Sequence, residues 1–510
     1  MAAAADQPKP LGGLTLWVVA VGLGLANFTV VLDQTVANVS VTHIAGGLAI
    51  SPTQGTWVIT SYAVAEAISV PLTGWVANRF GSVRTFTVAI CGFSLFSMLC
   101  GLSSSLAMLV GFRILQGLSG GPLMPLSQAL MLRIFPKENA SVGLGIWAMT
   151  TVVAPILGPI LGGSISDNWS WPWIFYINVP IVAVCLSVAV PKLRAFETKT
   201  ERVPIDVIGL VLLVTWVGAF QVVLDIGREH DWFASPAVLA GAIVAGVMFV
   251  AFVIWELTEK NPIVDLRIFR HRGFTMSTIT MSLAFGTYFA TVVLIPLWLQ
   301  GTLGYTATDS GHVTAFTGVF AVIMAPIAAR LMPKLDVRIL ICFGIVWLGS
   351  TSLMRAFWTA DADFWTLALP QLFQGLGMPF FFVGITTLAL GSVLTRETTS
   401  AAGLLSFLRT LSSAIAASIA QTAWDNRERL DRSDIVSTLN DPGGLLARLQ
   451  DGGMTVDQSR LVLDRLVETQ AATVAVDQIF LGASAVFFIA AVAVWFAPRP
   501  NKAVDTSAAH

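Results

Sequence analysis

The sequence is poor in charged residues, cysteine and histidine. Asp, Glu, Lys and Arg fill 12% of its 510 positions, whereas soluble domains carry about 25% charged residues. This shortage excludes an ordinary soluble globular protein. The net charge of −1 at pH 7 by itself indicates no class of partner.

The few cysteines and histidines disfavour metal sites and metal-dependent enzymes. The four cysteines, Cys91, Cys100, Cys185 and Cys342, lie in apolar stretches, and their spacing matches neither a zinc site nor a redox pair. We interpret them as packing residues, because free cysteine commonly behaves as a small hydrophobic residue. The five histidines are spread along the chain without an HExxH pair, so we expect no metal site and no hydrolase of that kind.

Long apolar stretches dominate the sequence instead. Hydrophobic residues make up 55% of the chain, and its mean hydropathy is +0.76. Fourteen windows are each long enough to cross a hydrocarbon core about 30 Å thick. They lie near 15–37, 55–77, 83–101, 107–130, 141–165, 173–190, 205–224, 236–256, 274–299, 309–331, 338–356, 364–390, 400–422 and 477–497. The sequence therefore predicts an all-α membrane protein with 14 transmembrane helices.

The distribution of Lys and Arg predicts the orientation of the chain. The leader, residues 1–14, lacks the basic region of a signal peptide, so we interpret the first window as a retained helix. With the N-terminus inside, nineteen Lys and Arg fall at inner ends and loops, and two, Arg228 and Arg355, fall in short outer loops. The positive-inside rule then predicts that the leader and the tail, 498–510, are both cytoplasmic.

Two segments about 258 residues apart resemble each other. ILQGLSGGPLMPLSQAL aligns with LFQGLGMPFFFVGITTL, so that Gln116-Gly117 matches Gln374-Gly375, and two further pairs of segments align in the same order. This repeat predicts two parallel six-helix halves, a pattern typical of major-facilitator transporters, which bind substrate between the halves. The predicted parts are an N-terminal half at 15–190, an inserted pair of helices 7 and 8 at 191–256, a linker at 257–273 and a C-terminal half at 274–497.

The segment GWVANRFGSVR lies in the predicted cytoplasmic turn between helices 2 and 3. Its small Gly74 permits close helix approach, and Gly81 reverses the chain. The segment resembles the cytoplasmic-loop signature of the major facilitator superfamily, except that Asn78 stands where the family normally has Asp. The resemblance implies a gating role for Arg79 and Arg84, and both also fit as positive-inside anchors.

The segment VAPILGPILGG in helix 5 resembles a motif of antiporters in this superfamily rather than of uptake permeases. Glycines four apart form a GxxxG face for close packing, and the prolines bend the helix. The residues concerned are Pro155, Gly158, Pro159, Gly162 and Gly163. The motif favours export over import, with simple helix packing as the alternative.

Motifs along almost the whole chain resemble one branch of the superfamily. LDQTVANVSV, QGTWVITS, PLTGW, WIFYINVP, GLVLLV, NPIVDL, GYTAT and the RTL of helix 13 are similar to EmrB-type inner-membrane subunits of tripartite multidrug efflux pumps. The resemblance implies a multi-pass drug:proton antiporter of the bacterial inner membrane that exports hydrophobic drugs and uncouplers and confers antibiotic resistance. It also implies a periplasmic membrane-fusion adaptor and an outer-membrane channel as partners, no nucleic acid, and no cofactor, since the proton gradient drives transport.

Four charged residues fall inside predicted helices, where charge is costly and needs a use. They are Asp33 in helix 1, Glu66 in helix 2, Arg113 in the helix-4 segment GFRILQG, which resembles a superfamily motif, and Arg409 in helix 13. Carboxyl groups titrate, whereas guanidinium groups stay charged. We therefore predict that Asp33 carries protons and faces the central cavity, that Glu66 is a second candidate proton carrier, and that the arginines tune both acids. The resembling family has an uncharged amide at the position of Glu66, so we favour a contact with cationic drugs over proton transfer there, and a structural role is the further alternative.

Aromatic and amide side chains of several helices are candidates for the drug cavity. Lipophilic cations and uncouplers would contact the members of this set that face inward. The candidates are Phe28, Gln34, Asn38, Trp57, Tyr62, Trp147, Tyr288, Phe316, Phe320, Phe373, Gln374 and Phe381.

Two segments outside the apolar windows have patterns of their own. The linker at 257–273 mixes apolar and basic residues, which predicts an interfacial helix on the inner leaflet. Residues 423–476 form a long periplasmic loop, with a capping box from Thr455 to Gln458 ahead of an amphipathic helix at 456–474. We predict that this loop docks the adaptor, because long structured loops usually have a function.

Other functions are less well supported by the sequence. A proton-coupled importer of the same fold is disfavoured mainly by the helix-5 motif. A membrane-embedded enzyme would need a nucleophile, base or metal constellation that the scattered histidines do not provide. A scaffold or sensor would have no reason to retain Asp33 and Glu66 in the membrane.

Overall fold

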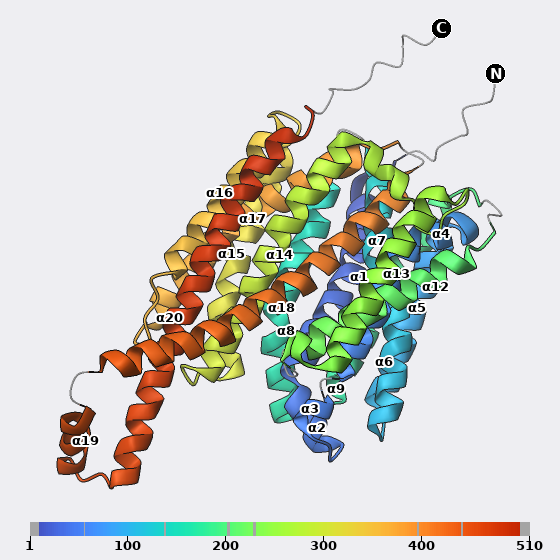
Figure 1. Cartoon of the computed structure of the whole chain (residues 1–510). Helices are drawn as coiled ribbons and strands as arrows, with labels where there is room; N and C mark the ends of the chain where they lie inside the picture. Colours follow the sequence, from blue (N-terminus) through green and yellow to red (C-terminus); the bar gives the residue numbers. More distant parts are fainter. Residues whose placement is uncertain are drawn as a thin grey trace, which may run out of the picture.

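A computed structural model describes residues 10–55, 57–136, 139–200, 204–227, 231–394, 397–439 and 442–499. Within these ranges the chain is helical and forms no strand, because a backbone in lipid must satisfy its own polar groups. Most of the predicted leader, most of the predicted tail and Arg228 lie outside the described residues. The predicted all-α class is confirmed (Figure 1).

The first half contains six spans, of which the fourth and the sixth are divided and the fifth is bent. Gly121 and Pro122 interrupt the fourth span, and α8, which contains Pro155 and Pro159, bends by 41° as its prolines predict. The elements are α1 (Gly13–Val39), α2 (Val41–Gly47), α3 (Pro52–Gly55), α4 (Trp57–Phe80), α5 (Ser82–Gly101), α6 (Leu106–Gly120), α7 (Leu123–Ile134), α8 (Ala140–Asn168), α9 (Trp173–Tyr176), α10 (Asn178–Val188), α11 (Val190–Leu193) and the short 3₁₀ helix η2 (Arg194–Phe196).

The inserted pair and the second half follow. Their elements are α12 (Val207–Ile226), η4 (Trp232–Ala234), α13 (Pro236–Thr258), η5 (Leu266–Arg270), α14 (Arg272–Gly301), α15 (Ala307–Leu331), α16 (Val337–Arg355), α17 (Phe364–Gly391), α18 (Thr398–Thr438), α19 (Pro442–Asp451), α20 (Val456–Ala493) and η7 (Val494–Phe496). Of the described spans, 12 are long and apolar enough to cross a membrane, or 13 with the bent α8. The remaining predicted span is α4, which carries Glu66.

The two halves lie side by side and meet along two seams. In one seam α4 contacts α18, and in the other α8 contacts α15. Helices α12 and α13 pack against each other, and α12 also packs on α4, so the inserted pair enlarges the first half. Figure 1 shows α15, α16, α17 and α20 on the opposite flank from α5, α6, α12 and α13.

The described residues within 423–476 form three helices rather than an irregular loop. Helices α18 and α20 run on beyond their predicted membrane windows, and α19 joins them at the far end. Arg432 Nη2 lies 2.5 Å from Asp464 Oδ1 and links the two extensions. The predicted capping box of Thr455 and Gln458 is present at the start of α20. We call residues 423–476 the helical hairpin.

The helical hairpin defines two ends of the bundle. It projects at the lower left of Figure 1, at the opposite end from the carboxyl terminus of α20. We call the end at which α20 finishes the terminal side, and the opposite end the hairpin side. Leu11, just before α1, donates its N–H to the carbonyl of Ile134 at 3.0 Å, so α1 begins near the end of α7.

The prediction of an interfacial helix in the linker is wrong. The linker contains the five-residue 3₁₀ helix η5, and its apolar Ile263, Val264 and Ile268 are buried against the protein instead of facing lipid. The buried Glu256 accepts a hydrogen bond from the Val264 N–H at 3.1 Å, which shapes this turn. A compact turn therefore joins α13 to α14.

Glu397 fixes the start of α18 to this linker. Its carboxylate lies 2.5 Å from Arg270 Nη2 and 2.9 Å from His271 Nε2. Burial raises the pKa of Glu397, but the hydrogen bond with His271 and the charge of Arg270 outweigh burial, so the pKa lies below its ordinary value. The contact is therefore intact at neutral pH and is lost only as the pH falls through that lowered pKa.

Candidate functional site

Asp33 lies in a buried polar network inside the first half. Its side chain is 1% exposed. One carboxylate oxygen, Oδ2, lies 2.5 Å from Arg113 Nη1 on α6. The other oxygen, Oδ1, accepts hydrogen bonds from Gln116 Nε2 at 3.0 Å and from Asn178 Nδ2 at 2.8 Å. Three of the sequence motifs, on α1, α6 and the start of α10, therefore meet at one carboxylate.

Arg113 is fully buried and has partners on several sides. Its Nε donates to the Val58 carbonyl at 3.0 Å, and its guanidinium carbon lies 4.1 Å from the ring centre of Tyr62, also on α4. Its Nη1 donates to Gln116 Oε1 at 2.9 Å as well. A buried ion pair is tolerated only when further hydrogen bonds surround both ions, and these contacts meet that requirement.

The expectation that Asp33 faces a central cavity is wrong for this conformation. Its carboxylate points into the first half, where Arg113, Gln116 and Asn178 enclose it. The physical reason is the cost of an isolated charge in a low-dielectric interior, which a facing guanidinium offsets. Any proton that reaches Asp33 must therefore displace its partnership with Arg113.

Glu66 is a second buried acid, on α4. It is 2% exposed, and its Oε2 accepts a hydrogen bond from Gln34, the neighbour of Asp33 on α1. The charges that act on Glu66 are those of Asp33, Arg113 and Arg409. Asp33 and Glu66 are thus linked through Gln34, which follows Asp33 in the chain and donates a hydrogen bond to Glu66.

Arg409 lies where the two halves meet. It belongs to α18 of the second half, and its guanidinium contacts the Met124 thioether and lies 5.2 Å from the ring centre of Trp147, both in the first half. Phe285 of α14 lies at 5.5 Å on the other side. Among the described residues no carboxylate is at ion-pair distance from Arg409. Its charge acts on Glu66 across the seam.

The seam between α4 and α18 is closed on the terminal side. A methyl group at Gly74 would lie 2.7 Å from Ser400 Oγ and 3.0 Å from its Cα. Nearby, Arg133 Nη2 donates to Thr399 Oγ1 at 3.5 Å. Only a residue without a side chain fits at position 74 when this seam is closed.

Gly74→Ala is expected to slow transport by opening this seam. The added methyl cannot be accommodated beside Ser400, and a shift of about 1.4 kcal/mol between the two conformations changes their ratio about tenfold. Drug export by cells should fall accordingly. Gly391→Ala is the matched control, because nothing lies within 4 Å of a methyl group there. Equal export by both variants would show that this seam does not open during transport.

Glu197 and Thr198, which the sequence analysis did not identify, hold the segment GWVANRFGSVR in place. Gly81, with a φ of 97°, makes the turn, and the Glu197 carboxylate then accepts the N–H groups of Val83 at 2.9 Å and Arg84 at 3.0 Å. Thr198 Oγ1 accepts the Ser82 N–H at 2.9 Å. An acid at a helix N-terminus is favourable. Glu197 lies 114 and 113 positions from Val83 and Arg84, so a local sequence pattern could not reveal this contact.

The remaining motif residues lie on α4, α5 and α8 and differ in burial. Asn78 and Arg84 are exposed, and Arg79 is half-buried. Gly158 of α8 packs against Thr35 of α1, and a methyl group at Gly162 would lie 3.0 Å from the Val36 carbonyl oxygen. The GxxxG face thus allows close contact between α8 and α1, as predicted. Gly163 is buried beside it, and Pro155 and Pro159 are half-buried.

The predicted cavity residues differ widely in exposure. Trp57 and Asn38 are exposed, Phe28, Gln34, Phe316, Phe320 and Phe373 are half-buried, and Tyr62, Trp147, Tyr288, Gln374 and Phe381 are buried. Tyr62 and Gln374 contact buried arginines, and Trp147 Nε1 donates to Ser127 Oγ at 2.9 Å. In this conformation these three side chains are therefore packed in the interior.

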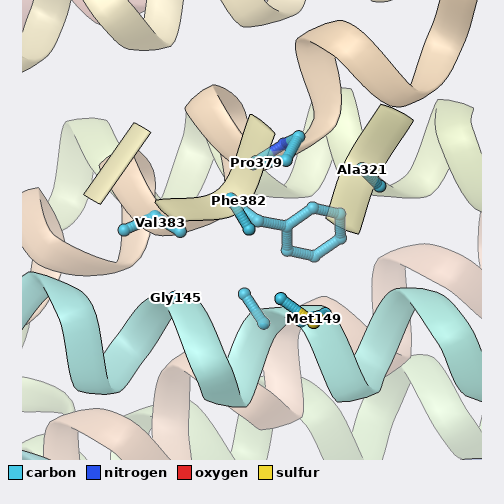
Figure 2. A pocket seen from close by; sticks show the side chains of 8 residues that line it. Gly145, Met149, Ala321, Pro379, Phe382 and Val383 are labelled. Carbon is cyan, nitrogen blue, oxygen red and sulfur yellow. The ribbon is translucent and has the colours of Figure 1, made fainter. Parts of the chain in front are cut away.

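One small cavity lies between the halves (Figure 2). Gly145, Ala148 and Met149 of α8 line it from the first half, facing residues of α15 and α17 that include Phe382. Its volume is about 10 Å³, room for a single water at most. The halves are therefore in contact here, and none of the predicted cavity residues lines this space. Phe316 instead lines an open hollow of about 310 Å³ between α15 and α17.

Sequence reasoning misplaced one functional candidate, Arg355. Predicted to lie in an outer loop, it is the last residue of α16 and is 0% exposed. Its Nη2 donates to Gln371 Oε1 at 2.8 Å and to Gln374 Oε1 at 2.6 Å. The counting rule failed because it assigns an arginine at a helix end to the water side, whereas this side chain turns inward among α16, α17 and α20.

Comparisons with known proteins agree with this arrangement of helices and motifs. The model of the Major Facilitator Superfamily matches residues 23–417. Among solved structures, the chain is similar to the human organic anion transporter MFSD10 (TETRAN), with a TM-score of 0.56, 12% identity and coverage of 92% of this chain and 99% of that one. It is also similar to the proton:xylose symporter XylE, with a TM-score of 0.57, 14% identity and coverage of 95% and 96%. The chain belongs to the major facilitator superfamily and is a multi-pass membrane transporter, not an enzyme.

Curated relatives narrow the family further. The multidrug export protein EmrB of Escherichia coli is 42% identical over 97% of this chain and 98% of its own length. The fatty acid resistance protein FarB of Neisseria gonorrhoeae is 42% identical with the same coverage, and EmrB of Haemophilus influenzae is 41% identical over 98% and 99%. Within the superfamily, the chain therefore belongs to the EmrB-type family of multidrug export proteins.

Proposed function

We propose that this protein exports hydrophobic toxic compounds from the bacterial inner membrane in exchange for protons. The observation that carries the proposal is the buried pair of Asp33 and Arg113. It joins a titratable group to α6 and α10 inside the first half, so that proton binding changes contacts between helices. Export, rather than import, is supported by the names of the relatives and by the helix-5 motif.

Protonation of Asp33 is the proposed switch. A neutral carboxyl group no longer offsets the charge of Arg113, so the contacts with Gln116 and Asn178 must rearrange. Asp33 shares α1 with Val36, on which Gly162 of α8 packs, and α8 contacts α15 of the second half. A shift of α1 is therefore transmitted to the seam between the halves.

Glu66 and Arg409 are the proposed second element of the switch. They lie on the facing helices α4 and α18, and the charge of Arg409 acts on Glu66 across the seam. A charged Glu66 favours the closed seam by attraction, and a protonated Glu66 weakens it. Asp33 thus controls contacts between helices within the first half, and Glu66 controls the contact between the two halves.

The proposed substrates are hydrophobic weak acids and other lipophilic drugs. One relative is named for multidrug export and another for fatty acid resistance. Among the predicted aromatic candidates, Tyr288 packs against Phe382, and the two ring centres are 6.2 Å apart. Phe382 lines the small cavity between the halves. Separation of the halves would expose such aromatic surface to an apolar substrate.

The helical hairpin is the proposed docking site for a periplasmic adaptor in a tripartite pump with an outer-membrane channel. This assigns the hairpin side to the periplasm and the terminal side, with both chain ends, to the cytoplasm. The hairpin projects from the bundle (Figure 1) and exposes apolar side chains such as Leu430, Val436, Leu461 and Leu466. Exposed apolar residues on a rigid projection are suited to partner binding.

Replacing residues 430–470 with a short flexible linker is expected to abolish resistance in cells while leaving transport by the purified protein intact. Trp424 Nε1 donates to the Ala472 carbonyl at 3.1 Å, so the two helices are already joined at the base of the cut. Adaptor pull-down from cells should be lost in this variant. Unchanged pull-down would show that the adaptor docks elsewhere.

Flux in proteoliposomes with an imposed pH gradient tests the proposed function. Drug is expected to move against its own gradient towards the hairpin side when protons enter from that side. Movement of drug and protons in the same direction would identify an importer instead.

A further inference from the structure

The second half contains a buried guanidinium without a counter-ion. Arg355 is 0% exposed, and the described residues place no carboxylate at ion-pair distance from it. Its neighbours are the amide oxygens of Gln371 and Gln374 and the ring of Phe480, whose centre lies 6.0 Å from the guanidinium carbon. Arg113 in the first half, by contrast, has Asp33.

The groups around Arg355 have an excess of hydrogen-bond donors. Arg355 Nε and Nη1, Gln371 Nε2 and Gln374 Nε2 are all buried, and none of them has an acceptor among the described residues. Buried donors without acceptors are costly, and a buried positive charge without a negative partner costs more. Four free donors, on a buried guanidinium and on the two amides that it contacts, are complementary to an anion.

The internal repeat shows which group is missing. Gln374 lies 258 positions after Gln116, and the same spacing takes Asp33 to Thr291. Thr291 carries no charge, and its hydroxyl donates to a carbonyl of its own helix. The second half therefore has a guanidinium, in Arg355, and the amides, but an uncharged residue where the first half has its carboxylate.

The packing around the two guanidinium groups is also alike. Arg113 lies 5.6 Å from the ring centre of Phe175, and Arg355 lies 6.0 Å from that of Phe480. The carbonyl of each phenylalanine accepts a hydrogen bond from a serine, at 2.8 Å in the first half and 3.0 Å in the second. The two sites thus have similar surroundings in the two halves, although the spacing of 258 takes Arg113 to Gln371 and the guanidinium of the second site comes from α16.

We propose that Arg355, Gln371 and Gln374 form a binding site for a small monovalent inorganic anion, with chloride as the probe. The anion supplies the negative charge that Asp33 supplies in the first half and accepts the free N–H groups. The carboxylate of Asp477, on α20, accepts the N–H of Trp358 and is not paired with Arg355. A transported carboxylic acid has related chemistry, and the experiment below separates the two sources.

Thermal unfolding of the purified protein tests this site without any transport assay. In sodium gluconate of constant ionic strength, replacement by chloride is expected to raise the unfolding midpoint to a plateau, because a ligand that binds only the folded state stabilises it. Arg355→Gln should abolish this rise. Arg338→Gln, on the same helix but paired with Asp336 at 2.8 Å, should keep it. Identical midpoints of the wild type in chloride and gluconate would overturn the proposal, as would protection by octanoate but not by chloride.

Gln371→Glu provides a test if Arg355→Gln does not fold. The new carboxylate would lie where the Gln371 amide oxygen is now 2.8 Å from Arg355. It is expected to raise the midpoint in gluconate and to remove the response to chloride, because the protein then carries its own anion. A chloride response equal to that of the wild type would contradict the site. Neither result depends on proton coupling, so the outcome is separate from that of the proposed function.

Discussion

Asp33→Asn is expected to abolish uphill drug export on a pH gradient, while the protein still reaches the membrane. The amide can keep hydrogen bonds with Gln116 and Asn178, but it cannot exchange a proton. Arg113 then has the same partner in every state, and the contacts of α1 no longer change with pH. Resistance in cells and uphill flux in proteoliposomes should fall to background, whereas downhill drug exchange should persist.

A second variant separates this loss of coupling from a loss of stability. Asp33→Asn leaves the buried charge of Arg113 without an acid, which costs about 3–5 kcal/mol when one partner of a buried pair is removed. Adding Arg113→Gln removes that charge, so the double variant should regain thermal stability without regaining uphill export. Uphill export by Asp33→Asn alone would show that Asp33 is a structural acid.

Glu66→Gln is expected to reduce the export of every substrate, cationic or not. Glu66 accepts a hydrogen bond from Gln34 and is attracted by the charge of Arg409. Loss of the Glu66 charge therefore removes an attraction between α4 and α18 rather than a drug contact. Transport of a lipophilic cation and of an acidic uncoupler should be measured side by side, together with the number of protons exchanged per drug.

Glu256→Gln is the matched control for this variant. Glu256 is also buried, at 0% exposed, but it binds the linker backbone at Val264 and lies outside the proposed switch. Its loss should lower stability and leave proton stoichiometry unchanged. A defect of Glu66→Gln confined to cations would make Glu66 a drug contact, and unchanged transport of both drugs would make it structural.

Much of the fold could be predicted because a membrane imposes simple rules. Each apolar window corresponds to a described helix or helix group, and the proline-rich motif of α8 produced the expected bend. The capping box at Thr455 could be recognised because its two partners are three residues apart. Local patterns of this kind require no knowledge of tertiary contacts.

The helical hairpin could not be predicted in full from the same rules. A fall in hydropathy after residue 422 marks the membrane edge but does not end a helix, and no strong helix breaker precedes Thr438, where α18 ends. The extension is exposed and polar, which is compatible with a helix supported by its partner. Arg432 and Asp464, which join the two extensions, lie 32 residues apart and have no common local signal.

The direction of side chains was the least predictable part of the site. The sequence showed that Asp33, Arg113 and Arg409 lie inside helices, but not which neighbours they face. Asp33 is enclosed by residues 80, 83 and 145 positions away, so the network depends on how three helices pack. The inward turn of Arg355 likewise depends on two glutamines of the following helix.

Proton release on drug binding is the most direct test of the central claim, that Asp33 exchanges its proton as part of transport. Purified protein in weakly buffered detergent solution, without any gradient, is mixed with drug while a pH indicator is followed. We expect proton release from the wild type, less release from Asp33→Asn, and drug binding by both. Equal release from the wild type and from Asp33→Asn would contradict the claim.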